Sequence, residues 1–292
     1  MRGADTPVAV TENPVSLTAY WMLGIRHRDA QSDRPIANDT LAHRFMDDRA
    51  REITEQFSSL TKPNASLPVR HRLIDDRLAA ELARDSALRV IVIGCGFDTR
   101  AFRLRGGRWI EVDEPALIAR KDAALPATES PNELVRIPVR FGVESLEEKL
   151  APYAAAERTA VVLEGVLNYL SDDQTRELLV VLTRLFPRHV VLCDMLGRRF
   201  IAIYSRPLVK RLRELGIEFA ASSETPEPLF HAAGYRTAGR DSIWKSANEL
   251  GAPGAPPAWA VRVLPSLRDG LCVWSFEYDQ ASPTPRLDEA NA

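Results

Sequence analysis

Five short apolar runs in the middle of the chain constrain the fold more than any other feature of the sequence. Each run is about five or six residues long and rich in valine and isoleucine, which is typical of strands buried on both faces of a parallel sheet. Helical patterns separate the later runs, most clearly at 172–186 and 195–215. Because strand and helix alternate, we expect a parallel sheet with right-handed crossovers. The expected strands are Leu88–Ile93, Arg108–Val112, Leu134–Val139, Thr159–Leu163 and His189–Cys193.

The C-terminal part adds two expected strands, at 235–243 and 271–278. No long helical pattern separates them, so we expect them to pair antiparallel at one edge, with the Gly-, Ala- and Pro-rich segment 246–257 as an excursion.

The N-terminal part is expected to be helical. Apolar residues recur at helical spacing over 16–56, where Pro35 is expected to mark the start of a second helix, and 70–84 reads as a third amphipathic helix. The segment 58–68 is expected to be a loop because it contains two prolines and several small polar residues. The predicted fold is thus α/β, a doubly wound, mostly parallel seven-stranded sheet with an N-terminal helical cap. We divide the chain into a flexible tail (1–13), the cap (14–86), the core (87–280) and a second tail (281–292).

Composition and charge exclude several classes of protein. The formal net charge is −2, so no nucleic-acid partner is expected. The three cysteines, Cys95, Cys193 and Cys272, lack the spacing of a zinc site or a disulfide framework, so no metal is expected. Neither a signal peptide nor an 18-residue apolar stretch occurs, which favours a cytoplasmic protein without a membrane span. The sequence contains no coiled-coil heptad repeat, so it does not predict an oligomeric state.

The loop after the first expected strand contains Gly94 and Gly96, which let a backbone pass close to a ligand. On its own this pattern is equally compatible with a plain tight turn. A dinucleotide fingerprint would need a third glycine where the chain has Thr99. The pattern therefore disfavours NAD or FAD and suits a nucleoside ligand without phosphates.

Acidic residues follow two other expected strands. Asp113 ends the second strand, where a carboxylate can accept hydrogen bonds from both ribose hydroxyls of an adenosine. Glu164 directly follows the fourth strand and could hold the ammonium of a methionyl group. Either acid alone could be a solvated strand end, but three such loops at the correct ends of the strands indicate a binding site.

Three strings carry a resemblance to a known family: the glycine loop at 94–104 (GCGFDTRAFRL), EVDEP at 111–115 and EGVLNYL at 164–170. They resemble the leucine carboxyl methyltransferase-like family, which includes bacterial O-methyltransferases of polyketide and other secondary metabolism. The stretch 70–76 looks like the arginine-bearing helix of that family. The resemblance covers about residues 16–280 and implies a class I methyltransferase fold that binds S-adenosylmethionine (SAM).

The resemblance also implies roles for individual residues. Gly94 and Gly96 would pack against SAM, Asp113 would bind its ribose, and Glu164 its amino group. Arg70 would pair with the methionyl carboxylate, and Asp98 would order the glycine loop. One position departs from the family pattern, because Arg140 stands where an acidic residue near the adenine is expected; the backbone of the neighbouring Phe141 could still reach the adenine.

The acceptor is expected to be a small molecule, methylated on a carboxylate or a phenolic hydroxyl. Asn168 and Tyr169 lie nearest the expected methyl position, and Tyr20, Trp21 and Tyr204 are candidates for lining an apolar acceptor pocket. A protein C-terminal carboxylate is a second possible acceptor, which the bacterial-style loop string disfavours. A third hypothesis, motivated by Arg140, is a SAM-fold protein that has lost methyl transfer and serves as a binding module or catalyses a non-methylating reaction.

Overall fold

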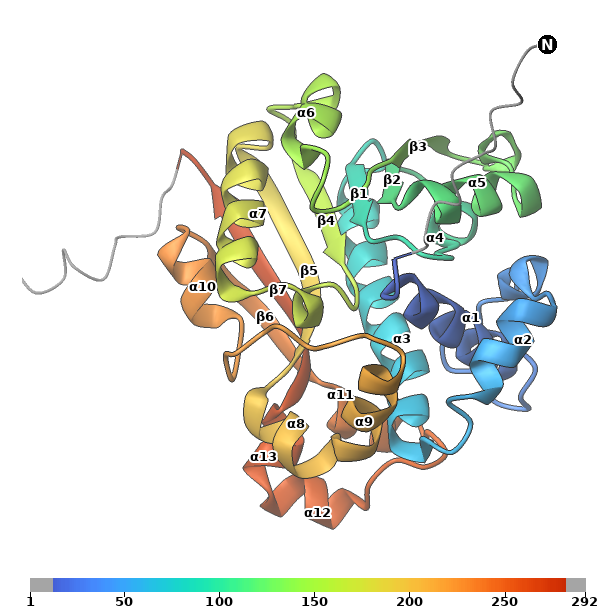
Figure 1. Ribbon diagram of the computed structural model, residues 1–292. Coiled ribbons are helices and arrows are strands. Elements are labelled where there is room, and N and C mark those ends of the chain that lie inside the picture. Colours follow the sequence, from blue (N-terminus) through green and yellow to red (C-terminus); the bar gives the residue numbers. More distant parts are fainter. Residues whose placement is uncertain (1–12, 282–292) are drawn as a thin grey trace, which may run out of the picture.

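Seven strands form one sheet in the order β3-β2-β1-β4-β5-β7-β6 (Figure 1). The computed structural model describes residues 13–281. The first five strands are parallel, and β7 runs antiparallel to both β5 and β6. The predicted mostly parallel seven-stranded sheet and its antiparallel edge are therefore confirmed. The strands are β1 (Arg89–Ile93), β2 (Arg108–Asp113), β3 (Glu133–Pro138), β4 (Thr159–Leu163), β5 (Arg188–Leu196), β6 (Arg236–Ser242) and β7 (Leu271–Asp279).

The α-helices lie on both faces of this sheet and beyond its carboxyl edge (Figure 1). They are α1 (Ser16–Ala30), α2 (Asp48–Glu55), α3 (Thr61–Arg84), α4 (Arg100–Arg103), α5 (Pro115–Ala124), α6 (Leu146–Leu150), α7 (Asp172–Leu185), α8 (Arg198–Tyr204), α9 (Arg206–Glu214), α10 (Glu227–Ala232), α11 (Ile243–Glu249), α12 (Ala258–Val263) and α13 (Pro265–Asp269).

Three sequence-based predictions about helices are wrong. Pro35 starts no helix, since α2 begins at Asp48 with Asp47 as its cap. The predicted loop 58–68 lies largely inside α3, which starts at Thr61. A proline in the first turn of a helix loses no intrahelical bond, and burial of the segment around Pro68 offsets the bond lost there. The predicted helix 195–215 begins within β5 and is then split into α8 and α9.

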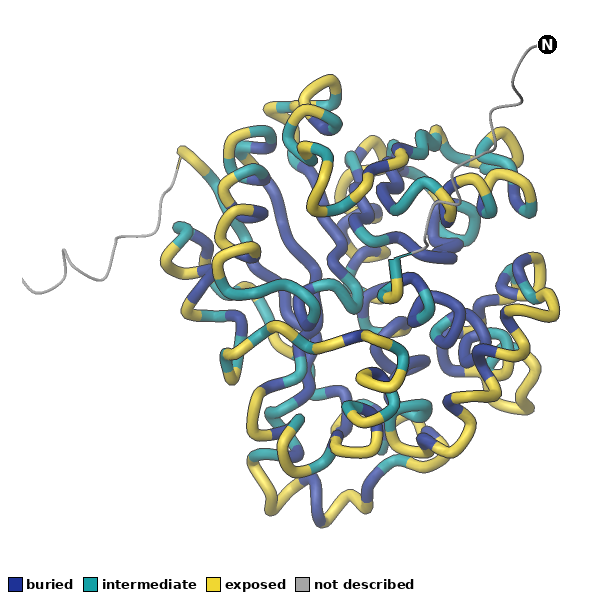
Figure 2. The backbone as a smooth tube through the Cα atoms, in the orientation of Figure 1, coloured by how far each residue is buried: buried dark blue, intermediate teal, exposed yellow. Residues whose placement is uncertain are grey.

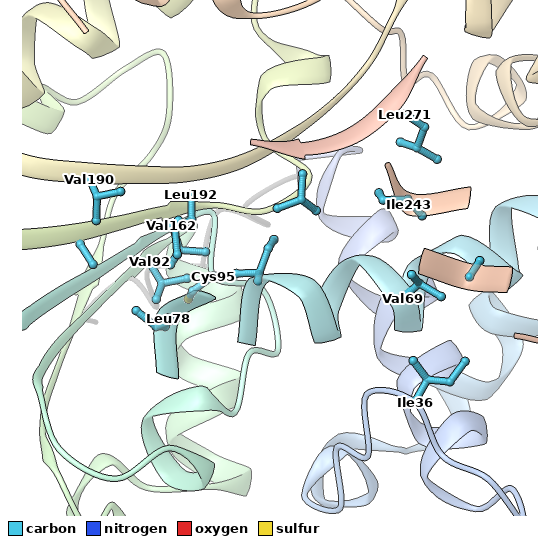
Figure 3. Packing of buried hydrophobic residues seen from close by; sticks show 14 of the residues in the cluster. Ile36, Val69, Leu78, Val92, Cys95, Val162, Val190, Leu192, Ile243 and Leu271 are labelled. Carbon is cyan, nitrogen blue, oxygen red and sulfur yellow. The ribbon is translucent and has the colours of Figure 1, made fainter. Parts of the chain in front are cut away.

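Alternate residues of the central strands face two separate apolar layers. In β1, Val92 faces the layer that contains Leu78 of α3, whereas Ile93 faces the layer that contains Leu179 of α7. Figure 3 shows the first of these layers, in which α3 side chains meet those of the sheet. Burial on both faces explains why these strands are apolar runs without alternation, and Figure 2 shows the strands buried beneath exposed helix surfaces.

A third apolar cluster joins α1 and α2 to α9 through residues such as Trp21, Ile53 and Leu208. Helix α3 packs on β5 and β7 as well as on α1. Because α3 contacts both the N-terminal helices and the sheet, the boundary between cap and core at residue 86 stays a prediction. The predicted tails fall outside the described residues, apart from Asn13 and Ala281. None of the described helices has both the length and the apolar character needed to cross a bilayer.

Candidate active site

The glycine loop follows β1, beside the switch point between β1 and β4 where the strand order reverses. Gly94 and Gly96 adopt φ values of +67° and +47°, which side chains other than glycine rarely adopt. A Cβ on Gly94 would lie 2.8 Å from a methyl group of Val166, and one on Gly96 would lie 3.1 Å from Cβ of Ala19 in α1. Conformation and close approach both require glycine here.

Asp113 ends β2 and faces this loop. Its Oδ2 accepts a hydrogen bond from the backbone N–H of Gly96 at 2.5 Å, and its Oδ1 accepts one from Glu114 at 2.7 Å. Burial raises the pKa of Asp113 to about 6, although the two backbone donors favour the ionised form. The carboxylate therefore titrates close to neutral pH.

Arg70 of α3 is held between two carboxylates from neighbouring strands. Its Nε donates to Oε1 of Glu164 at 3.1 Å, and its Nη1 donates to Oδ2 of Asp194 at 3.0 Å. Asp194 also accepts a hydrogen bond from Gly165 N at 2.6 Å, which ties the loop after β4 to β5. The remaining nitrogen, Nη2, contacts the thioether of Met22 at 2.8 Å. Because a thioether is a weak acceptor, Nη2 is the part of Arg70 that is available to an anionic ligand.

A second, buried layer of charges supports Glu164. Arg100 lies at the start of α4 and donates to Oε2 of Glu164 at 2.7 Å, while His71 Nδ1 lies 3.1 Å from the same oxygen. Burial opposes ionisation of Glu164, but Arg100, His71 and Arg70 together hold its pKa well below the usual range. Glu164 is therefore ionised at neutral pH.

Asp98 belongs to the same layer. Its Oδ1 accepts a hydrogen bond from the backbone N–H of Arg100 at 2.7 Å, and its Oδ2 pairs with the guanidinium of that residue. Asp75 of α3 also pairs with Arg100. The position of the glycine loop is thus tied through Arg100 to α3 and to Glu164.

The Arg140–Phe141 peptide follows β3. Backbone N–H of Arg140 donates to Glu144 at 2.8 Å, and that of Phe141 donates to Glu114 at 3.3 Å. The Arg140 side chain is 58% exposed and also contacts Glu144, at 3.4 Å. The arginine that departs from the family pattern is thus paired with a carboxylate four residues further along the chain.

A cavity of about 60 Å³ adjoins Arg70 and Gly165. Its walls are mainly apolar and aromatic and include Leu67, Phe219 and Trp244. It is much smaller than the roughly 300–1,000 Å³ of pockets that hold drug-sized ligands, so a ligand can enter only if the walls move apart. The predicted acceptor residues Trp21, Asn168, Tyr169 and Tyr204 all line it.

Asn168 and Tyr169 are positioned by contacts with other elements. Oδ1 of Asn168 accepts from Leu196 N at 2.9 Å, and the ring centroid of Tyr169 lies 5.5 Å from that of Phe219. Burial raises the pKa of Tyr169, against the opposing effect of a hydrogen bond with Thr18. Both residues are thus held at the Gly165 end of the cavity.

Tyr20 lies elsewhere. Its ring packs edge-on against Phe97 with centroids 4.9 Å apart, and the guanidiniums of Arg49 and Arg120 lie over it. It does not belong to the cavity lining, whereas the adjacent Trp21 does. Helical spacing alone could not distinguish these two neighbours.

The structure therefore brings the predicted residues together in two groups beyond the carboxyl ends of β1 to β4. Gly94, Gly96, Asp98, Asp113 and Phe141 lie at the ends of β1, β2 and β3 or in the loops that follow, whereas Arg70 lines the cavity and pairs with Glu164. Open α/β sheets bind ligands at this place.

Sequence reasoning missed several members of the site. Asp194 directly follows the predicted fifth strand, so the signal that found Asp113 and Glu164, an acid after an apolar run, also marked this residue. His71 and Arg100 stand within strings that were singled out, but nothing in the sequence indicated that they meet. For Met22, the sequence indicated only a place on an apolar helix and not its contact with Arg70.

Sheet order, helical layers and site position define a class I methyltransferase fold. A family model for leucine carboxyl methyltransferases matches residues 19–183, more than half of the chain. The chain belongs to the leucine carboxyl methyltransferase family.

Two relatives illustrate the similarity. A Parafrankia protein named "Putative S-adenosyl-L-methionine-dependent methyltransferase" is 32% identical over 202 residues, which are 67% of this chain and 56% of that protein. The tetracenomycin polyketide synthesis O-methyltransferase TcmP of Streptomyces glaucescens is 27% identical over 179 residues, 59% of this chain and 62% of TcmP. The matched region thus spans little more than half the length of the first relative.

Solved structures share the fold at low identity. A "putative methyltransferase" of Thermobifida fusca superposes with a TM-score of 0.57 and 14% identity, covering 94% of this chain and 100% of that one. The cyclopropane synthase MmaA2 of Mycobacterium tuberculosis superposes with a TM-score of 0.51 and 12% identity, covering 92% of this chain and 99% of that one.

Proposed function

We propose that this protein is a SAM-dependent O-methyltransferase that methylates a carboxylate on a small, largely apolar acceptor. Membership of the family and the names of the two relatives support methyl transfer and SAM as the cofactor. TcmP, named as a polyketide O-methyltransferase, supports oxygen as the methylated atom.

The residues present fit SAM. Gly94 and Gly96 let the loop after β1 turn at the switch point with φ values that suit glycine, and Asp113 supplies a carboxylate for ribose hydroxyls. Glu164 is an ionised acceptor for an ammonium, and Nη2 of Arg70 is a donor for a carboxylate. When bound, SAM supplies an electrophilic methyl group on a sulfonium.

The residues that line the cavity beside Arg70 support a carboxylate as the group that is methylated. The titratable side chains that line it are Lys62, Arg70, Tyr169 and Tyr204; no Asp, Glu, His or Cys is among the described lining residues. A phenol has a pKa near 10 and gains from a general base, whereas a carboxylic acid is already ionised at neutral pH. A cavity without a general base among its described lining residues therefore suits a carboxylate.

The protein contributes mainly positioning in this scheme. The amide nitrogen of Asn168 donates no hydrogen bond within the described part of the chain, and Asn168 lines the cavity. This donor can hold an acceptor oxygen in line with the methyl group, and such positioning supplies much of the catalysis of a one-step displacement.

Product chemistry tests the proposal. The enzyme is incubated with SAM carrying a labelled methyl group and with a matched pair of aromatic acceptors, one a carboxylic acid and the other a phenol of the same skeleton. We expect label in the acid only, released as methanol by mild alkali because the product is an ester. Alkali-stable label in the phenol would contradict the carboxylate assignment, and no transfer to any acid or phenol would contradict the methyltransferase.

The non-methylating alternative depended on Arg140. Since its guanidinium is more than half exposed and paired with Glu144, we expect Arg140→Asp to change SAM affinity less than about threefold. A much larger change would restore that alternative.

A further inference from the structure

One wall of the cavity beside Arg70 contains an unused hydrogen-bond donor. Trp244, the second residue of α11, lines the cavity and is only 2% exposed. Its indole Nε1 is buried and has no hydrogen-bond partner in the described part of the chain. Buried donors are nearly always paired, so a donor without a partner needs an explanation. Among the described buried side-chain atoms that lack a partner, Nε1 of Trp244 is the one whose residue lines the cavity.

Two other polar groups of the lining are satisfied by the protein itself. The indole N–H of Trp21 donates to Oδ1 of Asn64 at 2.7 Å, and the hydroxyl of Ser66 donates to the carbonyl of Pro63 at 2.8 Å. The cavity lining therefore contains two tryptophans of opposite kind. The N–H of Trp21 is already committed to the wall, whereas that of Trp244 is available to a ligand.

The surroundings of Trp244 restrict the kind of group that can accept this hydrogen bond. Phe200, Ile243 and Leu271 line the cavity and belong to the same apolar cluster as Trp244, and Figure 3 shows Ile243 and Leu271 near each other. An indole N–H only donates, so its complement is an acceptor atom. A charged group is costly to bury among apolar side chains, and a hydroxyl brings a donor that needs its own partner. A carbonyl oxygen is both neutral and an acceptor only.

The sheet topology separates this donor from the Gly165 end of the cavity. Ser242 at the end of β6 and Met195 near the end of β5 both pair with Cys272, so β6 ends at the same edge of the sheet as β5. β6 is the third strand from β4, and a spacing of about 4.8 Å between neighbouring strands places their backbones roughly 14 Å apart. Trp244 directly follows this end of β6 and therefore contacts a part of the acceptor remote from the methylated carboxylate.

Resting on the proposed function, we propose that the acceptor carries a carbonyl group on its apolar body, and that this oxygen accepts a hydrogen bond from Nε1 of Trp244. Trp244 is then a specificity-determining residue, which selects oxygenated acceptors over their hydrocarbon analogues and takes no part in the methyl transfer. Because Nε1 is buried, the carbonyl reaches it when the walls of the cavity move apart, as entry of any acceptor already requires.

The test uses the full-length enzyme, saturating SAM and two carboxylic acids with the same elongated polycyclic skeleton. One acid carries a ketone at the end remote from the carboxylate, and the other carries a methylene group there. We expect wild-type kcat/KM for the keto acid to exceed that for the methylene acid about tenfold, mainly through KM, because the contact is the same in the ground state and the transition state.

Two tryptophan variants separate the donor from the ring. Trp244→Phe keeps an aromatic ring but removes the N–H, so the ratio of the two kcat/KM values should fall close to one. Trp21→Phe is the matched control, because the N–H of Trp21 already donates to Asn64. Trp21→Phe should change kcat/KM for both acids alike and leave the ratio as in the wild type.

A second measurement uses the wild type and so does not depend on the folding of a variant. The indoles are labelled with ¹⁵N, and the complex with S-adenosylhomocysteine is titrated with each acid. The Trp244 signal is assigned through Overhauser contacts with Ile243. We expect the keto acid, but not the methylene acid, to move this proton signal downfield, since a previously unpaired N–H becomes hydrogen-bonded. The signals of Trp21 and Trp109, whose N–H groups are already bonded, should stay in place.

A wild-type ratio near one, a ratio that survives Trp244→Phe, or an unmoved Trp244 signal would overturn the carbonyl site, while methylation of both acids would still support the proposed function. If the enzyme methylated neither acid, the proposed function would fail as well.

Discussion

The carboxylate of Asp113 accepts a hydrogen bond of 2.5 Å from the backbone N–H of Gly96. This bond joins the ends of β1 and β2 and holds the glycine loop against the acid expected to bind ribose. The two features were inferred from separate motifs, and the structure makes them one unit. The unit depends on the ionised carboxylate, because only that form offers acceptors on both oxygens.

SAM binding should therefore weaken in acid. Since burial raises the pKa of Asp113 to about 6, the ionised form predominates at pH 7 and is scarce at pH 5. We expect the Kd for SAM to rise about tenfold between pH 7 and pH 5, measured by calorimetric titration at several pH values. Asp113→Asn should bind weakly with little dependence on pH, and a flat wild-type profile would argue against ribose binding by the ionised acid.

Gly94→Ala should destabilise the fold by more than its backbone conformation alone explains. A left-handed residue other than glycine costs about 1–2 kcal/mol, and the new Cβ would also lie 2.8 Å from Val166. Gly216→Ala is the matched control, because Gly216 has φ +75° and no atom within 4 Å of its added Cβ. Denaturant unfolding should show a larger loss for Gly94→Ala, partly restored by Val166→Ala. Equal losses at the two glycines would show that the Val166 contact is unimportant.

His189 should make stability depend on pH. Its Nδ1 lies 2.6 Å from Phe186 O and its Nε2 lies 2.7 Å from the Tyr235 hydroxyl, an arrangement that suits the neutral ring. Burial lowers its pKa to about 4, so the unfolded chain binds more protons between pH 4 and 6.5. Stability is present above pH 6.5 and falls as the pH drops, by about 2 kcal/mol between pH 7 and 5 from this group. In His189→Gln, the free energy of unfolding should fall by about 2 kcal/mol less between pH 7 and 5 than in the wild type, as measured by denaturant unfolding. The same pH dependence in both proteins would refute a neutral, buried His189.

Asp194→Asn should impair both stability and SAM binding. The carboxylate is fully buried and pairs with Arg70, and removing one partner of a buried pair typically costs about 3 kcal/mol or more. An asparagine oxygen can still accept from Gly165 N, so the loop after β4 should keep its position. We expect a roughly tenfold weaker Kd for SAM by calorimetry. Unchanged affinity in a destabilised variant would mean that Asp194 serves the fold alone.

The strands and the acids at their ends could be predicted because local signals determine them. Strands buried on both faces are mostly apolar, so a carboxylate directly after such a run is conspicuous. Asp113 and Glu164 were found in this way, and Asp194 was detectable by the same rule.

The contacts between the N-terminal helices and the core could not be predicted. Met22 meets Arg70 across 48 residues of sequence, and Ala19 lies against Gly96. Helical periodicity shows that a face is apolar but not what covers it, so Tyr20 and Trp21 received the same role although only Trp21 lines the cavity. The course of α3 through Pro68 was missed because proline is normally a signal that a helix ends.

Calorimetric titration of the wild type and of Asp113→Ala with SAM and S-adenosylhomocysteine measures directly whether SAM binds at the ends of β1 and β2. We expect saturable binding with a Kd on the order of 10 μM in the wild type and its loss in Asp113→Ala, with the fold of the variant verified by circular dichroism. Absence of binding in the wild type, or equal affinity in the two proteins, would contradict a SAM site at the ends of β1 and β2.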